Sequence, residues 1–342
     1  MKKYFLLLAA LLPGMILLAQ SDDQKPYLTK SLSDQHIKNV EVGTSGGSIT
    51  VAGSTASEAR VEVYISGNKN LSKEEIESRL QKYELTVSVN GDKLTAIAKR
   101  KSENFNWNNS GLSIAFKVYV PGDVSTRLGT SGGSIHLSKL NGEQNFSTSG
   151  GSLHINDMTG KVHGSTSGGS IHIENAKSDV NLTTSGGSIE ASNCQGTISL
   201  HTSGGSLHLE NLNGTIEAST SGGSIHGTKI SGDFTTSTSG GSVHLDDLAC
   251  TLDASTSAGS IDVAFNTLGK SVKLSNSGGN VSLSIPGGKG LDLKLRGNKI
   301  STTQLSNFKG DVEEGSINGQ LNGGGIPIKV DAGGGRINLA IR

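Results

Sequence analysis

The sequence predicts an all-β fold, a single-chain parallel β-solenoid with 18-residue coils and an N-terminal α+β cap. Three observations predict it: a Thr-Ser-Gly-Gly-Ser motif returns every 18 residues, apolar residues alternate in two short runs after each motif, and 48 of the 342 residues are glycine. Stacked repeats bury a continuous core that a single repeat could not form. The preference for right-handed crossover connections favours a right-handed coil.

Each repeat is numbered here in places one to eighteen from the Thr of its motif. The regular copies begin at Thr130, Thr148, Thr166, Thr184, Thr202, Thr220 and Thr238. Thr256 continues the series with Ala258 in place of the first motif glycine, and Asn276 follows after a step of 20 residues. An isolated copy begins at Thr44, and a degraded copy ends at Ile337.

Two short strands are predicted within each repeat. Apolar residues occupy places six and eight, as at Ile171 and Ile173, and again places fifteen and seventeen, as at Val180 and Leu182. Such alternation places one side of each strand in a core. The Gly pair of the motif is expected to form a sharp corner without a Cβ clash, and the motif hydroxyls to bond along the stack. The glycine usual at place thirteen is expected to turn the chain with positive φ; these residues are Gly142, Gly160, Gly196, Gly214 and Gly232.

The chain divides into five parts on this reading. Residues 1–20 are predicted to be a signal peptide, because Lys2 and Lys3 precede an apolar run that is short for a membrane span. Residues 21–36 form an N-terminal segment, and 37–129 form a first coil with a capping insertion. Residues 130–285 form the regular solenoid, and 286–342 form irregular C-terminal coils. Within the insertion, Ser72 and Glu75 have the spacing of a capping box and predict a helix over Lys73 to Tyr83.

Composition restricts the partners and the redox chemistry. Lys plus Arg and Asp plus Glu number 30 each, so no net charge favours a nucleic-acid partner. The sequence also does not indicate an integral membrane protein. Cys194 and Cys250 fall three coils apart, roughly 14 Å at the spacing of β-strands, which is beyond the reach of a disulfide. Two separate buried thiols are therefore expected.

The repeats resemble the putative adhesin family of exported bacterial β-strand-repeat proteins, a domain of unknown function. The resemblance is carried by the Gly-Gly-Ser-Ile copies, by Val118 to Pro121 before the array, and by Leu321 to Ile326 near its end. It covers roughly residues 37 to 342. It implies a β-solenoid and an adhesin-like role, and it supplies no catalytic residues.

Place seven is the most specific candidate site in the sequence, because it faces outward between two buried strand residues. It holds His136, His154, His172, Glu190, His208, His226, His244 and Asp262. In a stacked solenoid these side chains form one column along the rod. Repulsion between stacked imidazolium ions is expected to lower their pKa values.

Several functions are compatible with this pattern. The main prediction is an exported, non-catalytic adhesin-like or scaffold protein of the periplasm, outer cell surface or extracellular space, with a glycan or an envelope or cell-surface protein as partner. The first alternative is metal sequestration by His136, His154, His172, Glu190, His208, His226 and His244, which could share a Zn²⁺ or Cu²⁺ ion. Ligands in one straight column lack the converging directions that zinc sites usually have, so the simpler reading is a solvated histidine ladder.

The second alternative is a polysaccharide-active enzyme, since such enzymes also use β-helices. Acid–base chemistry needs carboxylates that converge on one bond, and the array holds Asp179, Asp246 and Asp247 without an insertion that builds a cleft. The dense aromatic patch at Phe105 and Trp107 is a possible partner contact. An ice-binding face is disfavoured, because the motif hydroxyls lie at Gly-Gly corners. No cofactor motif is present, and we expect neither a cofactor nor catalysis.

Overall fold

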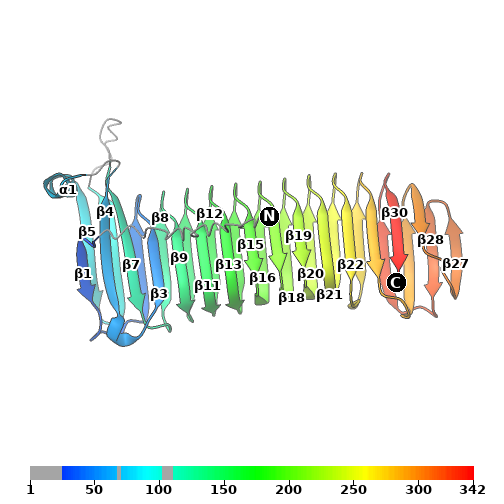
Figure 1. Ribbon diagram of the computed structural model, residues 1–342, viewed down its shortest axis with the longest axis horizontal. Helices are drawn as coiled ribbons and strands as arrows, with labels where there is room; N and C mark the ends of the chain where they lie inside the picture. The colour runs from blue at the N-terminus through cyan, green and yellow to red at the C-terminus, as the bar shows by residue number, and fades with distance from the viewer. Residues whose placement is uncertain (1–24, 68–70, 102–110) are drawn as a thin grey trace, which may run out of the picture.

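The computed structural model describes residues 25–67, 71–101 and 111–342, which form one long rod of stacked β-coils (Figure 1). Within these described ranges, thirty strands join into one continuous hydrogen-bonded system. The predicted β-solenoid is confirmed. The predicted signal peptide at 1–20 lies outside the described residues. Within those residues, no helix has the length and apolar character needed to cross a membrane.

Each regular coil contributes two parallel strands, and strand residues pair with those 18 positions away, as Leu153 does with Ile171. The separation rises to 20 where the chain reaches the Asn276 copy, as between Leu252 and Val272. The first strand of each coil begins at place six. These strands are β9 (Ile135–Leu140), β11 (Leu153–Thr159), β13 (Ile171–Lys177), β15 (Ile189–Ser192), β17 (Leu207–Glu210), β19 (Ile225–Thr228), β21 (Val243–Thr256), β22 (Ile261–Phe265) and β24 (Val281–Ile285). The second strand ends at the first residue of the next motif. These strands are β8 (Ser125–Thr130), β10 (Gln144–Thr148), β12 (Val162–Thr166), β14 (Val180–Thr184), β16 (Gln195–Thr202), β18 (Asn213–Thr220), β20 (Ser231–Thr238) and β23 (Val272–Asn276), while β21 runs through both strands of its coil.

The core runs along the axis of the rod and is built from the predicted places. Ile171, Ile173, Val180 and Leu182 are all buried, as are their equivalents in neighbouring coils. Parallel, in-register stacking puts each apolar side chain directly above its copy. The short strands are stable only in this stack, since the inner face of a single coil would remain exposed.

The first residue of each motif is a buried threonine that joins two coils. Thr202 Oγ1 donates to the carbonyl oxygen of Gly187 in the preceding coil at 2.7 Å and accepts from the N–H of Gly205 at 3.2 Å. Asn276 replaces threonine with equivalent bonds, from its Nδ2 to the carbonyl of Gly259 at 2.7 Å and to its Oδ1 from the N–H of Gly279 at 2.9 Å. The predicted bonding of motif hydroxyls along the stack is confirmed.

The two glycines of the motif have different roles. A Cβ on the second glycine, such as Gly205, would collide with the backbone carbonyl of the coil before it, whereas a Cβ on the first, such as Gly204, would lie 3.5 Å from its nearest neighbours. The expectation that the pair avoids a Cβ clash therefore holds for the second glycine alone. The sequence agrees, since Ala258 stands at the first position and Gly259 keeps the second.

Place thirteen also differs in part from the expectation. Gly160, Gly196, Gly214 and Gly232 have the predicted positive φ, but Gly142 does not. A Cβ at Gly142 would meet the backbone of Val124, so close approach explains this glycine instead.

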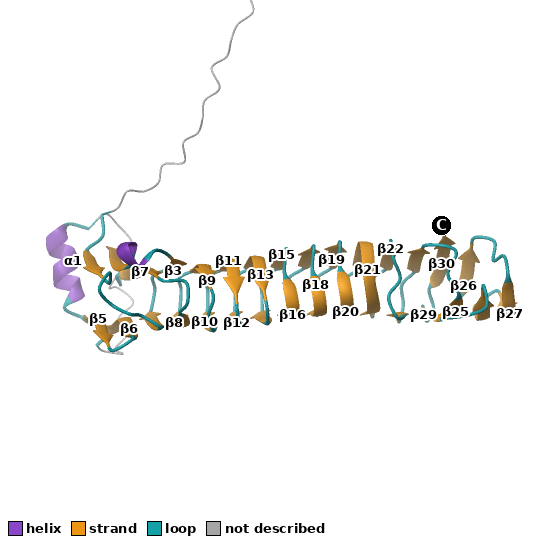
Figure 2. Cartoon of the chain, turned by 90° about the horizontal axis from the view of Figure 1, so that it is seen from below, coloured by secondary structure: helices purple, strands orange, loops and turns teal. Residues whose placement is uncertain are grey.

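The N-terminal end folds back on itself. Its strands are β1 (Leu28–Ser31), β2 (Asn39–Thr44), β3 (Ile49–Gly53), β4 (Arg60–Ser66), β5 (Tyr83–Asn90), β6 (Lys93–Arg100) and β7 (Ser113–Val120), and a short 3-10 helix spans Ala56–Glu58. The coil of β2 and β3 pairs with β8 and β9 on one side and with β6 and β7 on the other. The predicted helix is present as α1 (Lys73–Leu80) with its capping box, and it ends three residues early because Tyr83 begins β5. Figure 2 shows α1 at this end of the rod.

The C-terminal end is also built out of chain order. Its strands are β25 (Leu291–Arg296), β26 (Lys299–Thr302), β27 (Phe308–Glu313), β28 (Ser316–Leu321), β29 (Ile326–Asp331) and β30 (Arg336–Ile341). β29 and β30 stack directly on β23 and β24, and they are covered in turn by β25 and β26, which precede them in the chain. The degraded copy ending at Ile337 is thus the coil that follows the Asn276 copy.

Candidate functional site

The place-seven residues form the predicted column on the first strands. His136, His154 and His172 are consecutive partners in the parallel register, and Glu190 separates them from His208, His226 and His244. Asp262 pairs with His244 and ends the column. The column exists because each side chain lies between two buried residues of a strand whose register is fixed by the core.

Two pairs of neighbouring imidazole rings within the column are stacked, and the other two pairs are tilted. The ring centroids of His136 and His154 are 4.7 Å apart and nearly parallel, and those of His208 and His226 are 5.4 Å apart. His172 Nδ1 lies 2.9 Å from a carboxylate oxygen of Glu190, so the acid interrupting the column is held by its neighbour. His244 Nε2 lies 2.8 Å from Asp246 at place nine of the same coil.

The environment favours the neutral form of two of these rings. Burial lowers the pKa of His136 below its usual value of 6.5, and His154 lowers this pKa further. Burial likewise lowers the pKa of His226, with smaller contributions from His208 and His244. The predicted direction is confirmed at these two residues, but burial rather than repulsion between rings is its main cause.

A shallow groove of about 520 Å³ follows this column from His172 to His244. Glu210 and Asp246, which face outward at place nine, line it beside the histidines. The groove therefore combines imidazole and carboxylate groups that recur along the rod, an arrangement suited to weak hydrogen bonds repeated along an extended partner.

The described residues contain no group of three or more His, Cys, Asp or Glu side chains arranged to hold a metal ion. Each coil contributes its imidazole from the same side at the spacing of adjacent strands, so the ligands do not converge on one point. Metal sequestration remains a prediction from the sequence.

The structure contains a second column, at place ten, that was not predicted from the sequence. Residues there have left-handed backbone with φ between 53° and 59°; they are Lys139, Asp157, Asn175, Asn193, Asn211, Lys229 and Asp247. Asn and Asp tolerate this conformation best, and their side chains bond from coil to coil, as from Asn211 Nδ2 to Asn193 Oδ1 at 2.7 Å. The recurrence of Asn and Asp just before the apolar corner residue was the available signal.

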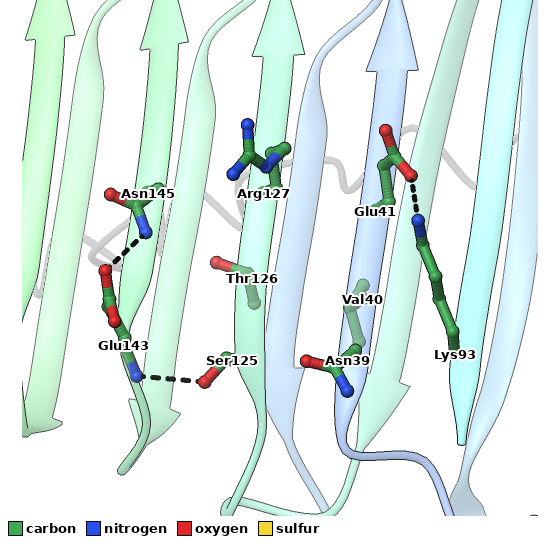
Figure 3. A pocket seen from close by; sticks show the side chains of 9 residues that line it. All are labelled: Asn39, Val40, Glu41, Lys93, Ser125, Thr126, Arg127, Glu143 and Asn145. Atoms are coloured by element: carbon green, nitrogen blue, oxygen red, sulfur yellow. Dashed lines mark hydrogen bonds and ion pairs between the residues drawn. The ribbon is translucent and has the colours of Figure 1, made fainter.

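A polar groove of about 560 Å³ lies on the second-strand face near the N-terminal end (Figure 3). It is lined from β2, β6, β8 and β10, which stacking alone brings together. In it, Lys93 Nζ lies 2.6 Å from Glu41 Oε2, and Asn145 Nδ2 donates to Glu143 Oε1 at 3.0 Å. Arg127 projects between Glu41 and Asn145. No motif in the sequence marks this groove.

The remaining predicted features are the thiols and the aromatic patch. Cys194 and Cys250 are free and buried, as predicted. Burial raises the pKa of Cys194 and raises that of Cys250 to about 12. Phe105 and Trp107 lie outside the described residues, so their predicted partner contact stays a prediction.

The C-terminal third of the chain is similar to a known family. Residues 234–340 match the Toastrack family, DUF4097. The matching segment begins in β20 and includes the coils that are stacked out of chain order at the C-terminal end. No curated protein matches the chain.

Two solved structures are similar to the chain. One is a putative cell adhesion protein from Clostridium sporogenes, with 12% identity over 93% of this chain and 100% of that one, and a TM-score of 0.21. The other is a putative adhesin from Bacteroides fragilis, with 12% identity over 91% of this chain and 96% of that one, and a TM-score of 0.23.

Proposed function

We propose that this protein is an exported, non-catalytic β-solenoid that acts as an adhesin-like or scaffold protein in the cell envelope or at the cell surface. The observation that carries the proposal is the register of the coils, which holds equivalent polar side chains in columns along one rigid rod. Each coil repeats the same weak contact. Contacts linked on one body gain effective concentration, so the rod binds a repetitive partner far more tightly than one coil would.

The same geometry supports binding over catalysis. General acid–base catalysis needs two groups placed on either side of one reacting bond. The imidazoles of the column project from one face instead, and their stacked rings lie parallel, as at His136 and His154. Export is supported by the basic and apolar leader at residues 1–20.

The test is a binding screen of residues 21–342 on glycan and extracellular-matrix arrays. A matched variant carries Asn in place of the six place-seven histidines. We expect binding that strengthens steeply with the density of immobilised ligand, and its loss in the variant would assign it to the column. Absence of binding to every array component, or turnover of a polysaccharide, would contradict the proposal.

A further inference from the structure

The second-strand face carries its own line of exposed and half-buried hydrogen-bond donors, and unlike the histidine column of the first-strand face this line includes an arginine. At place sixteen, Arg127, Asn145, His163 and Asn181 are consecutive partners in the register; we call them the donor row. Strand spacing puts successive members about 4.8 Å apart along the rod. The guanidinium and the two amides donate through several N–H groups, and an imidazole offers at least one.

Two grooves follow this row and share its first members. Arg127 and Asn145 line both the 560 Å³ groove toward β6 and an adjoining groove of about 430 Å³ toward β14. The second groove passes over Phe146 and Gly164, which occupy place seventeen on the buried side of their strands. Ser147 and Ser165, exposed at place eighteen, add hydroxyls beside the row.

Arg127 is the cation of the row, and Glu41 is its neighbour in the parallel register. The pKa of Glu41 is lowered chiefly by its hydrogen bond with Lys93 and to a smaller extent by the charge of Arg127. The two carboxylates in its groove make their short contacts with other residues, Glu41 with Lys93 and Glu143 with the neutral amide of Asn145. Among the described residues, Arg127 itself makes no hydrogen bond or ion pair, and its side chain is exposed. A guanidinium presents a rigid fork that matches a carboxylate with two parallel hydrogen bonds.

We propose that the donor row binds a linear polysaccharide of uronic acids, with Arg127 holding a sugar carboxylate and Asn145, His163 and Asn181 donating to oxygens of the following sugars. The direction of the row favours an extended chain over a single terminal sugar. One coil advances by nearly the length of one β-linked pyranose, so successive sugars meet successive coils. This inference names a ligand class for the proposed adhesin-like function and rests on it.

The test is calorimetric titration of residues 21–342 with a short β-linked oligomannuronate at low salt. Its methyl ester serves as a neutral ligand of the same shape, and poly-glutamate as a polyanion without sugars. We expect the acid to bind, the ester to bind roughly 10-fold or more weakly, and added salt to weaken binding. Equal affinity for the ester or for poly-glutamate would overturn the proposal.

Variants locate the site. Arg127→Gln is expected to weaken uronate binding roughly 10- to 100-fold, and Arg127→Lys by less, because lysine keeps the charge but loses the fork. Arg336→Gln removes an exposed arginine near the opposite end of the rod and is expected to change nothing. Circular dichroism checks that each variant is folded. An unchanged affinity in folded Arg127→Gln would refute the assignment.

The uronate titration and the array screen distinguish failure of the donor-row proposal from failure of the proposed adhesin-like function. If the protein binds other array components but no uronate, the adhesin-like function stands and the donor-row proposal falls. If it binds nothing at all, both fall.

Discussion

The two motif glycines provide a sharp test of the stacked geometry, because they are chemically identical neighbours with opposite surroundings. The test compares Gly205→Ala with Gly204→Ala in the middle of the array. A methyl group at residue 205 would collide with the backbone of Gly187 in the coil before it, whereas one at residue 204 would lie 3.5 Å from the nearest atoms. Neither glycine has positive φ, so backbone strain does not enter the comparison.

The expected change in the free energy of unfolding follows from the atoms that the added methyl group displaces. An extra methyl in a close-packed site costs about 1–3 kcal/mol. The carbonyl it displaces, that of Gly187, also accepts the hydrogen bond of Thr202, and loss of that bond adds about 1 kcal/mol. Gly205→Ala should therefore destabilise the fold by about 2–4 kcal/mol. Gly204→Ala should be neutral or stabilise it by up to about 1 kcal/mol, since alanine reduces the entropy of the unfolded chain.

The assay is urea unfolding followed by far-ultraviolet circular dichroism, with both variants and the parent protein measured together. A second pair, Gly168→Ala and Gly169→Ala, repeats the comparison in another coil, where a Cβ contacts its neighbours in the same way. Unfolding midpoints that are the same for the two members of each pair would show that successive coils do not approach as closely as described, and the reasoning would be refuted.

Three further predictions concern Thr202, two histidines of the column and the two cysteines. Thr202→Val should destabilise the fold by about 1–3 kcal/mol, because it leaves a buried N–H and a buried C=O without their hydrogen-bond partner. Thr202→Ser keeps the hydroxyl and should recover much of the lost stability. Equal urea unfolding midpoints for Thr202→Val and the parent protein would contradict the prediction. His136 and His226 have lowered pKa values in the folded protein, so the unfolded chain takes up protons first as the pH falls below about 6.5. The melting temperature should therefore drop between pH 7.5 and pH 5. The drop should be smaller in a variant with Asn at both positions. Cys194 and Cys250, buried and with raised pKa values, should resist alkylation by iodoacetamide at pH 8 until urea unfolds the protein; rapid labelling of the native chain would show that they are accessible.

The candidate column was predictable in full, while the second-strand groove was not. A column at place seven follows from two facts in the sequence, an 18-residue period and an outward position between two apolar residues. The groove around Arg127 combines Asn39, Lys93 and Glu143 from separate stretches outside the regular motif. Their proximity depends on how the N-terminal insertion folds back, which no local pattern specifies.

The sequence by itself determined the coil, its two strands and the side of each strand that is buried. The repeat has a strict period of 18 residues, and apolar residues alternate with polar ones along each strand. Only one register of the stacked coils buries all of these apolar residues. The sequence also determined that the two cysteines stay apart. Only the tertiary structure decided the order of coils at both ends, where β6 and β7 underlie the Thr44 coil and β29 and β30 precede β25 and β26 in the stack. Only the tertiary structure also distinguished the roles of the two glycines of each motif. The clash that a Cβ would make with the preceding coil exists only when two coils are in contact.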